Sequence, residues 1–200
     1  MALRFNESIQ KNILENIMDG EREAFAYAAS LFIYHAEASY KKINYDLKYK
    51  GDLAMGRFFA RKLGDKLASS PLFEDVDLVL PVPLHWKRKW KRGYNQAEII
   101  AAEVANSLNI PLNTKILFRK RKTTTQTKLS VSRKRDNVKN AFSLSTVPHW
   151  GVNPTNIKHI LVIDDVFTTG ATLSSCHKVL REFFPKTVKI SVATLAFVDE

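Results

Sequence analysis

The chain has 200 residues, of which 31 are Lys or Arg and 20 are Asp or Glu, giving a formal net charge of +11. This length suits one domain with a small appendage, and the charge favours a polyanionic partner: nucleic acid, an anionic membrane surface or a phosphorylated small molecule. The single cysteine, Cys176, excludes an intrachain disulfide and a multi-cysteine zinc site. No stretch approaches the ~20 apolar residues that span a bilayer, and no signal-peptide layout opens the chain. We therefore expect a cytoplasmic protein without a membrane segment.

The first part of the chain is predicted to be mainly helical, because its apolar residues recur at helical spacing. We divide the chain into residues 1–23, an N-terminal amphipathic helix, and residues 24–200, the main domain. The elements predicted before residue 70 are a helix at 5–18, one or two strands at 24–35, and helices at 36–48 and 53–68.

From residue 76 onward, predicted strands and helices alternate. Two of the strands are almost wholly apolar runs, which is typical of strands buried on both faces. The alternation predicts an α/β fold with a parallel sheet and crossover helices, in which ligands bind at the carboxyl ends of the strands. The predicted strands are residues 76–82, 116–118, 156–163 and 188–197, and the predicted helices are 93–109 and 171–184.

Two acidic residues and a turn rich in Thr and Gly follow the apolar strand predicted at residues 156–163. Ionised carboxylates at Asp164 and Asp165 accept hydrogen bonds, and the vicinal hydroxyls of ribose donate them. The next residues open a helix and offer backbone N–H groups and hydroxyls to a phosphate. Taken alone, an acidic pair is usually part of a solvated turn, and Thr-Thr-Gly-x-Thr is usually a helix cap. Found together after a buried strand, the two motifs indicate a ribose 5-phosphate site. The phosphate residues are Thr168, Thr169, Gly170, Ala171 and Thr172.

Two further segments are strongly basic. Five of the seven residues 86–92 are Lys or Arg, and residues 119–135 contain eight Lys or Arg and no acid. The first segment suits a pyrophosphate, although a solvated turn or a nucleic-acid patch with Trp86 and Trp90 stacking on bases are alternatives. The second is a long polar loop, which inside a compact domain is usually functional or disordered.

Together, the three segments resemble the sites for phosphoribosyl pyrophosphate (PRPP) in type I phosphoribosyltransferases. The resemblance implies a Rossmann-like core with a small N-terminal helical or hood region, Asp164 and Asp165 as the catalytic pair, and Mg²⁺ arriving with PRPP. It further implies a mobile loop that closes over the sugar and excludes water. The implied pyrophosphate residues are Pro83, Leu84, Lys87, Arg88 and Arg92, and the implied mobile-loop residues are Arg119, Lys122, Gln126, Lys128 and Arg135.

The sequence motifs of the chain resemble those of the ComF family of bacterial competence proteins more closely still. The similarity covers roughly residues 24–198, with motifs in the family's order at residues 45–51, 81–85, 92–97, 126–142 and 162–173. Many ComF proteins begin with a four-cysteine zinc module that has no counterpart here before Ala24. We therefore expect no zinc, and metal analysis showing stoichiometric zinc would contradict this.

The resemblance implies transfer of a phosphoribosyl group to an acceptor nitrogen, in a protein linked to natural competence and DNA uptake. The acceptor is not identified, and because the sequence shows no glutaminase domain with an N-terminal cysteine, we do not expect a full amidophosphoribosyltransferase. Whether the protein turns over PRPP stays open at this point. The alternative is a single-stranded DNA-binding competence factor that uses PRPP as a sensed ligand and works with DNA-uptake proteins. Its candidate contacts are Trp86, Trp90, Lys91, Lys120 and Arg121.

Overall fold

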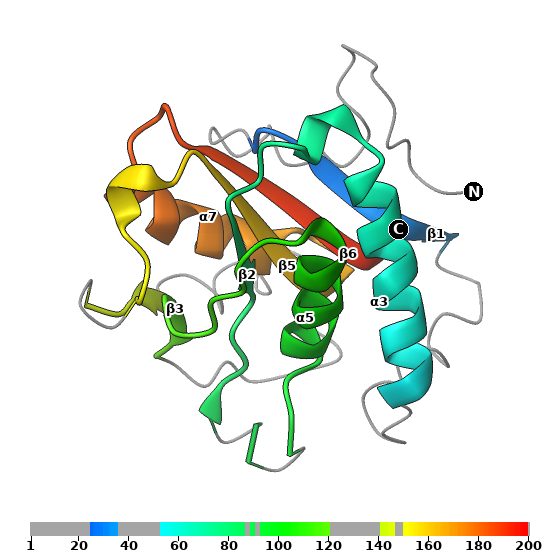
Figure 1. Ribbon diagram of the computed structural model, residues 1–200. Coiled ribbons are helices and arrows are strands. Elements are labelled where there is room, and N and C mark those ends of the chain that lie inside the picture. The colour runs from blue at the N-terminus through cyan, green and yellow to red at the C-terminus, as the bar shows by residue number, and fades with distance from the viewer. Residues whose placement is uncertain are drawn as a thin grey trace.

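The computed structural model describes residues 25–35, 53–86, 89–90, 93–120, 141–146 and 150–199 (Figure 1). The helices predicted at residues 5–18 and 36–48 lie outside these ranges, as does the whole N-terminal region 1–23. The division of the chain into two parts, and the hood, therefore stay predictions.

A sheet of four parallel strands forms the centre of the described fold (Figure 1). Neighbouring strands follow the order β1-β6-β5-β2, and every neighbouring pair is parallel. The predicted α/β class with a parallel sheet is thus confirmed. The strands are β1 (Ala28–His35), β2 (Leu78–Pro81), β5 (His159–Phe167) and β6 (Lys189–Asp199).

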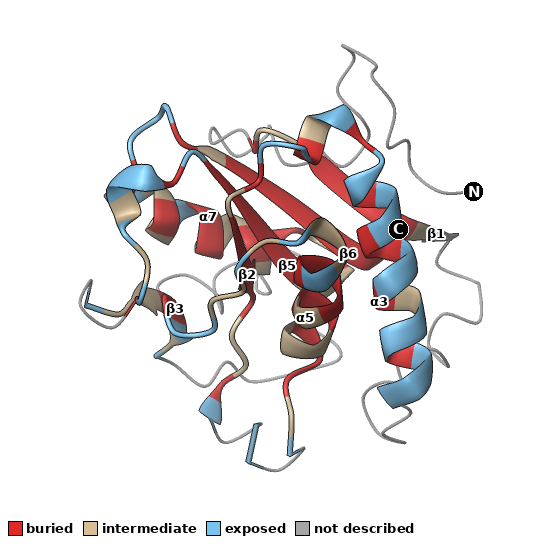
Figure 2. Cartoon of the chain, viewed as in Figure 1, coloured by how far each residue is buried: buried red, intermediate tan, exposed pale blue. Residues whose placement is uncertain are grey.

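Helices cover both faces of this sheet, and the alternating residues of β5 explain how. Leu161 and Ile163 share a core with α3 and α5, whereas Ile160 and Val162 share a second core with α7. Both faces of the sheet are consequently buried, as the continuous apolar runs predict (Figure 2). None of the described helices is long and apolar enough to cross a membrane. The helices are α3 (Leu53–Ala68), α5 (Gln96–Leu108) and α7 (Ala171–Phe183), with short 3₁₀ turns η2 (Pro71–Phe73) and η4 (Pro154–Asn156).

The strand predicted at residues 116–118 exists as β3 (Leu117–Arg119), but its placement in the parallel sheet was wrong. It pairs antiparallel with β4 (Phe142–Leu144) in a separate two-stranded sheet. The sequence pattern did not reveal β4, because three residues are too few to show an alternating pattern. The hairpin packs on the same side of the fold as α7, where Phe142 joins that helix's core.

A turn at Asn113 explains why the chain leaves the parallel sheet before β3. The preceding residue, Leu112, still bridges Val79 of β2 in parallel orientation. The side-chain oxygen of Asn113 then accepts hydrogen bonds from the backbone N–H groups of Lys115 (2.9 Å) and Ile116 (3.1 Å). This turn redirects the backbone, so that the next strand finds β4 and not β2 as its partner.

The helix α5 begins three residues later than predicted. Gly93 adopts a left-handed φ of 81°, and Asn95 caps the helix by accepting a hydrogen bond from the N–H of Ala97 (3.2 Å). At the other end, Asn109 takes a left-handed φ of 55° and closes the helix.

The strand β5 continues four residues past the end predicted at residue 163. Its neighbour β6 still pairs with it as far as Phe167, so the backbone keeps its hydrogen-bonding partners on that side. Asp164 and Asp165 therefore lie within a strand rather than in the turn after it.

Two arginines hold α3 against α5. The carboxylate of Glu103, buried on α5, accepts hydrogen bonds from Arg57 (2.6 Å) and Arg61 (2.8 Å) of α3. Burial raises the pKa of Glu103, but these hydrogen bonds outweigh it and leave the pKa below its ordinary value. Because the arginines are largely exposed, they satisfy the buried charge while their own outer faces stay in water.

A buried histidine, His159, connects the residues at the start of β5 and β6 through hydrogen bonds. The Nδ1 atom of His159 lies 2.7 Å from Asp75, and its Nε2 atom lies 2.7 Å from the hydroxyl of Ser191. A neutral ring donating to Asp75 and accepting from Ser191 satisfies both contacts, because Ser191 also accepts from the N–H of Tyr27 (3.2 Å). The order acid, histidine, serine resembles a hydrolase triad, yet His159 and Ser191 are both 0% exposed. No substrate reaches such a serine, so the network is structural.

We predict that this network makes the protein less stable in mild acid. Burial lowers the pKa of His159 below its ordinary value of about 6.5, with Asp75 partly opposing the shift. The unfolded chain therefore takes up this proton first as the pH falls, and the stabilisation present above pH ~6.5 is lost through the window beneath it. Each such proton contributes at most about 1.4 kcal/mol per pH unit to the unfolding free energy.

Urea denaturation between pH 7.5 and 5.5 measures this dependence. In His159→Gln, which keeps a polar side chain but does not titrate, we expect a lower stability with a shallower pH slope. An unchanged slope in that variant would show that other groups cause the acid sensitivity.

Candidate functional site

The candidate site lies where β2 ends and β5 continues. The last residue of β2, Pro81, pairs with Ile163, and the N–H of Val82 donates to the carbonyl of Ile163 (2.8 Å). Beyond this point β6 still pairs with β5 on one side, whereas the pairing with β2 on the other side has ended. Asp164 and Asp165 follow at once and are half-buried, whereas residues 160–163 are fully buried. The two predicted carboxylates thus occupy the first positions at which the strand gains access to solvent.

The carboxylate of Asp164 interacts with a backbone N–H group and with the buried thiol of Cys176. Its Oδ1 atom accepts a hydrogen bond from the backbone N–H of Asp165 (2.9 Å). Burial raises the pKa of the Cys176 thiol well above its ordinary value; the negative charge of Asp164 raises it further, and the positive charge of Arg119 lowers it. Asp164 and Arg119 therefore lie within electrostatic reach of one buried group, and the thiol stays protonated and unreactive.

The predicted phosphate loop connects β5 directly to α7. Gly170 adopts a left-handed φ of 72° and occupies the N-cap position of α7, with no side chain capping the helix. The first backbone N–H groups of a helix have no partner within it, so this end favours an anion. Thr168 is exposed, and Thr169, Ala171 and Thr172 are half-buried around the same turn.

Close packing requires a glycine at position 170. A Cβ atom there would lie 2.9 Å from the ring of Phe167, a residue buried at the end of β5. That ring packs in turn against Phe197 of β6, with centroids 5.5 Å apart. The turn is thereby pressed against the core, which fixes the start of α7 relative to the carboxylates.

The loop after β2 is anchored at both ends to the same edge. The side-chain amide of Asn95 donates to the carbonyl of Val82 (3.0 Å), while its oxygen caps α5. Pro83 and Leu84 are half-buried between these points, and His85 is buried. Asn95 was not predicted as a site residue, although an Asn two residues after a glycine and just before a helix is a recognisable cap signal.

Exposed tryptophans stand on this loop. Trp86 and Trp90 are 64% and 88% exposed, four residues apart in the chain. Between them, Lys89 is paired with Glu98 of α5 (2.9 Å) and is not available to a ligand in this arrangement. The remaining predicted basic residues of the loop, Lys87, Arg88, Lys91 and Arg92, lie outside the described residues.

The third predicted segment is described only at its beginning. Arg119 ends β3, where its guanidinium lies 5.1 Å from the ring centroid of Phe142, so this predicted loop residue belongs to the hairpin. Lys120 is exposed, and its N–H donates to Ala141 across the hairpin (2.7 Å). The other predicted residues, Arg121, Lys122, Gln126, Lys128 and Arg135, lie outside the described part of the chain.

The side chains at this site suit a metal ion that arrives bound to a substrate better than one held by the protein alone. Within the described residues no three His, Cys, Asp or Glu side chains gather as a metal site. Asp164 and Asp165 provide oxygen ligands of the kind that Mg²⁺ prefers, but this ion usually keeps several waters and binds substrate phosphates. The residues present therefore fit Mg²⁺ that arrives with a polyphosphate.

Comparison with known proteins reveals similarity to competence and DNA utilization proteins. No family model matches the chain. Over 114 residues, 57% of the chain, it is 37% identical to Competence protein F of Haemophilus influenzae, covering 48% of that protein. It is 32% identical over the same length to DNA utilization protein YhgH of Escherichia coli O157:H7, covering 47%, and 33% identical over 104 residues to the YhgH of Escherichia coli K12, covering 43%. The chain thus spans about half the length of the curated relatives that it matches.

We predict that Gly170→Ala destabilises the protein more than Gly93→Ala. Both positions have a left-handed backbone, which costs a non-glycine residue about 1–2 kcal/mol, but only residue 170 would also contact a buried ring. Around residue 93 nothing lies within 4 Å of an added Cβ. Chemical denaturation should give about 1–3 kcal/mol of lost stability for Gly170→Ala. An equal loss in both variants would show that the contact with Phe167 does not restrict the turn.

Proposed function

We propose that this protein binds PRPP at the described sheet edge and transfers its phosphoribosyl group, in a process linked to competence and the use of DNA. The carrying observation is an order of features on β5 and α7: two half-buried carboxylates, a left-handed glycine, and a helix start without a side-chain cap. Carboxylates accept hydrogen bonds from ribose hydroxyls, and the helix start favours phosphate. Both ends of a ribose 5-phosphate thus meet complementary groups on one short stretch of chain.

The proposed reaction requires positioning more than a protein nucleophile. The bond from the anomeric carbon to pyrophosphate breaks, and pyrophosphate leaves with the electron pair. A nitrogen of the acceptor gives its electron pair to that carbon and then loses a proton. Asp164 and Asp165 hold the ribose hydroxyls, and residues 168–172 hold the 5-phosphate. Chemistry of this kind is accelerated by orientation and by neutralising charge as it develops.

Positive charge near the leaving group completes the proposed site. Pro83 and Leu84 directly follow Val82, whose N–H donates to the carbonyl of Ile163, one residue before the carboxylates, and this proximity supports assigning the backbone after β2 to pyrophosphate. In the proposal Lys87, Arg88 and Arg92 neutralise pyrophosphate, and residues of the segment after Arg119 close over it. Mg²⁺ bound to PRPP adds Lewis-acid neutralisation of the same phosphates.

A second function, binding of single-stranded DNA, is favoured by the exposed tryptophans. Trp86 and Trp90 present large aromatic faces to solvent on a basic loop. Bases stack on such faces whatever their identity, and nearby cations bind the phosphates. The similar proteins are named for competence and for DNA utilization, which points the same way. If DNA binding is the main function, PRPP is a ligand that the protein senses without turning it over. Lys91, Lys120 and Arg121 are then further DNA contacts.

We predict that replacing both carboxylates abolishes PRPP binding. Each lost charge-assisted hydrogen bond costs about 1.5–3 kcal/mol, so Asp164→Asn with Asp165→Asn should weaken the affinity by roughly 100-fold or more. Isothermal titration with PRPP and MgCl₂ measures this.

The matched control is Glu74→Gln, which removes a negative charge from an exposed position just after η2. It should bind PRPP like the wild type. A wild-type protein that ignores PRPP would defeat the proposal, and PRPP binding without release of pyrophosphate in the presence of nitrogen acceptors would favour the sensor.

We predict that Trp90→Ala weakens binding to oligothymidylate by about 5- to 150-fold, since one stacked base is worth about 1–3 kcal/mol. Fluorescence anisotropy at several salt concentrations should also show a steep loss of wild-type affinity as salt rises. Phe58→Ala, which removes an aromatic ring that is 56% exposed on α3, is the control and should leave binding unchanged. Equal effects of both variants, or a flat salt dependence, would exclude this DNA surface.

A further inference from the structure

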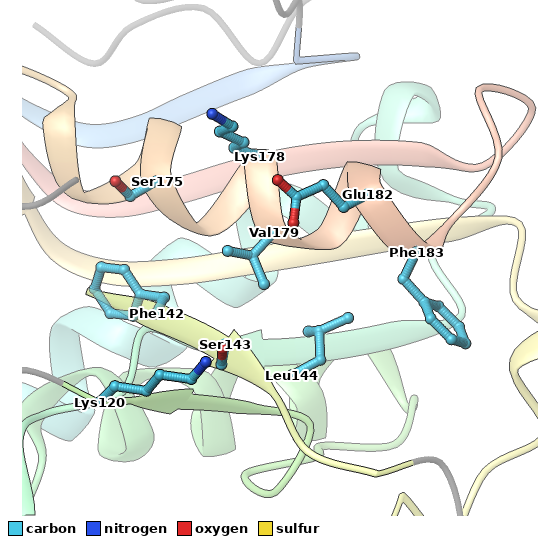
Figure 3. A pocket seen from close by; sticks show the side chains of 9 residues that line it. All are labelled: Lys120, Phe142, Ser143, Leu144, Ser175, Lys178, Val179, Glu182 and Phe183. Atoms are coloured by element: carbon cyan, nitrogen blue, oxygen red, sulfur yellow. The ribbon is translucent and has the colours of Figure 1, made fainter. Parts of the chain in front are cut away.

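A groove lies between β4 and α7, and of the residues assigned above only Lys120 lines it. It has a volume of about 490 Å³. One wall is the strand Phe142–Leu144 with Lys120 beside it, and the other is a single stripe of α7 that includes Lys178, Val179 and Phe183 (Figure 3). In Figure 3 the side chains of Leu144 and Val179 lie across the groove from each other. The stripe differs from the α7 face that is buried against the sheet.

The hydrogen-bond register of the hairpin turns alternate backbone groups of β4 away from β3. The N–H of Lys120 donates to Ala141, and that of Ser145 donates to Ile116, so these pairs are hydrogen-bonded ones. Hydrogen-bonded and non-bonded pairs alternate along an antiparallel ladder. The N–H and C=O groups of residues 142 and 144 must therefore point away from β3. Within the described part of the chain, no backbone bond joins these groups to a partner.

The spacing and chemistry of these groups suit another strand. Residues 142 and 144 are one β-repeat apart, so two residues of an extended peptide match them with N–H and C=O groups in both directions. A phosphate chain has only acceptor oxygens, which satisfy the N–H groups but repel the carbonyls. Three residues in extended form span about 10 Å, which is a suitable length for this short wall.

The charges around the groove favour an acidic peptide. Lys120 and Lys178 stand on opposite walls, against one carboxylate, Glu182. Apolar side chains of Leu144, Val179 and Phe183 lie between the charged groups, and Phe183 is exposed. A second copy of this chain would bring a further net charge of +11, which opposes self-association through this face.

We propose that this groove binds an extended acidic segment of a partner protein, which pairs with β4 as a third strand of the hairpin sheet. Its alternate residues pack on Leu144, Val179 and Phe183, and its carboxylates meet Lys120 and Lys178. The mode is addition of a strand to an open sheet edge, with the backbone providing affinity and the side chains providing selectivity. It is independent of PRPP binding.

The probe is a fluorescent, capped hexapeptide of alternating glutamate and valine, titrated by anisotropy into the full chain at 150 mM salt. We expect Lys178→Glu to weaken binding by at least about fivefold. Lys62→Glu makes the same charge change on exposed α3 and should have little effect. A hexapeptide N-methylated at alternate residues should bind at least about tenfold more weakly, because it no longer donates to β4.

Several outcomes would overturn the proposal. The first is no binding of the unmodified hexapeptide. Equal weakening by Lys178→Glu and Lys62→Glu would indicate non-specific attraction, and unchanged binding of the methylated peptide would exclude strand pairing. Displacement by oligothymidylate would assign the groove to nucleic acid. A dimer in sedimentation that Lys178→Glu dissociates would assign it to a second copy.

Discussion

The unequal length of two neighbouring strands determines where the candidate site lies. β2 and β5 are paired up to Pro81 and Ile163, and β5 then continues beside β6 alone. Up to that point every side chain of β5 is buried by a helix layer or by the hairpin, which explains the apolar run. Just beyond it, the backbone remains hydrogen-bonded to β6 while one flank opens. The end of β2 therefore forms a step in the sheet, past which β5 continues. Asp164 and Asp165 lie at this step, so they are held by a rigid strand and still reach solvent.

The elements around this step are fixed by short contacts that converge on it. Asn95 joins the start of α5 to the carbonyl of Val82, immediately after β2. Phe167 packs under Gly170, which sets the direction of α7 as the chain leaves β5. Arg119 approaches from the hairpin, close enough for its charge and that of Asp164 to act on the same thiol. A sugar phosphate needs its hydroxyl and phosphate partners at a set separation, and in the proposed site this framework would hold them.

The sequence predicted the parts of this arrangement that are local and missed those that depend on distant partners. The apolar runs and the acidic pair before a Thr-Gly turn indicated the strands, the helix α7 and the carboxylates. The three residues of β4 carry no period of their own, and they form a strand because the Asn113 turn delivers β3 to them. His159 and Asp75 are 84 residues apart, so no pattern in the sequence predicts their contact. The end of β5 was also misjudged, since pairing with β6 outweighs the loss of apolar character.

The distribution of charge gives the strongest physical reason to look for an anion at this edge. Thirteen of the 31 basic residues lie in residues 86–92 and 119–135, which contain no acid, so the rest of the chain has slightly more acid than base. In the described framework, Arg57, Arg61, Lys89 and Lys189 are all paired with carboxylates. A charge excess that served solubility would be spread over the surface. Here it is concentrated in two segments, one following β2 and one beginning at Arg119, whose charge acts with that of Asp164 on the Cys176 thiol. Like charges gathered in this way repel one another unless an anion joins them. A ligand with a polyphosphate or a nucleic-acid backbone relieves that repulsion, and its binding should therefore stabilise the folded chain.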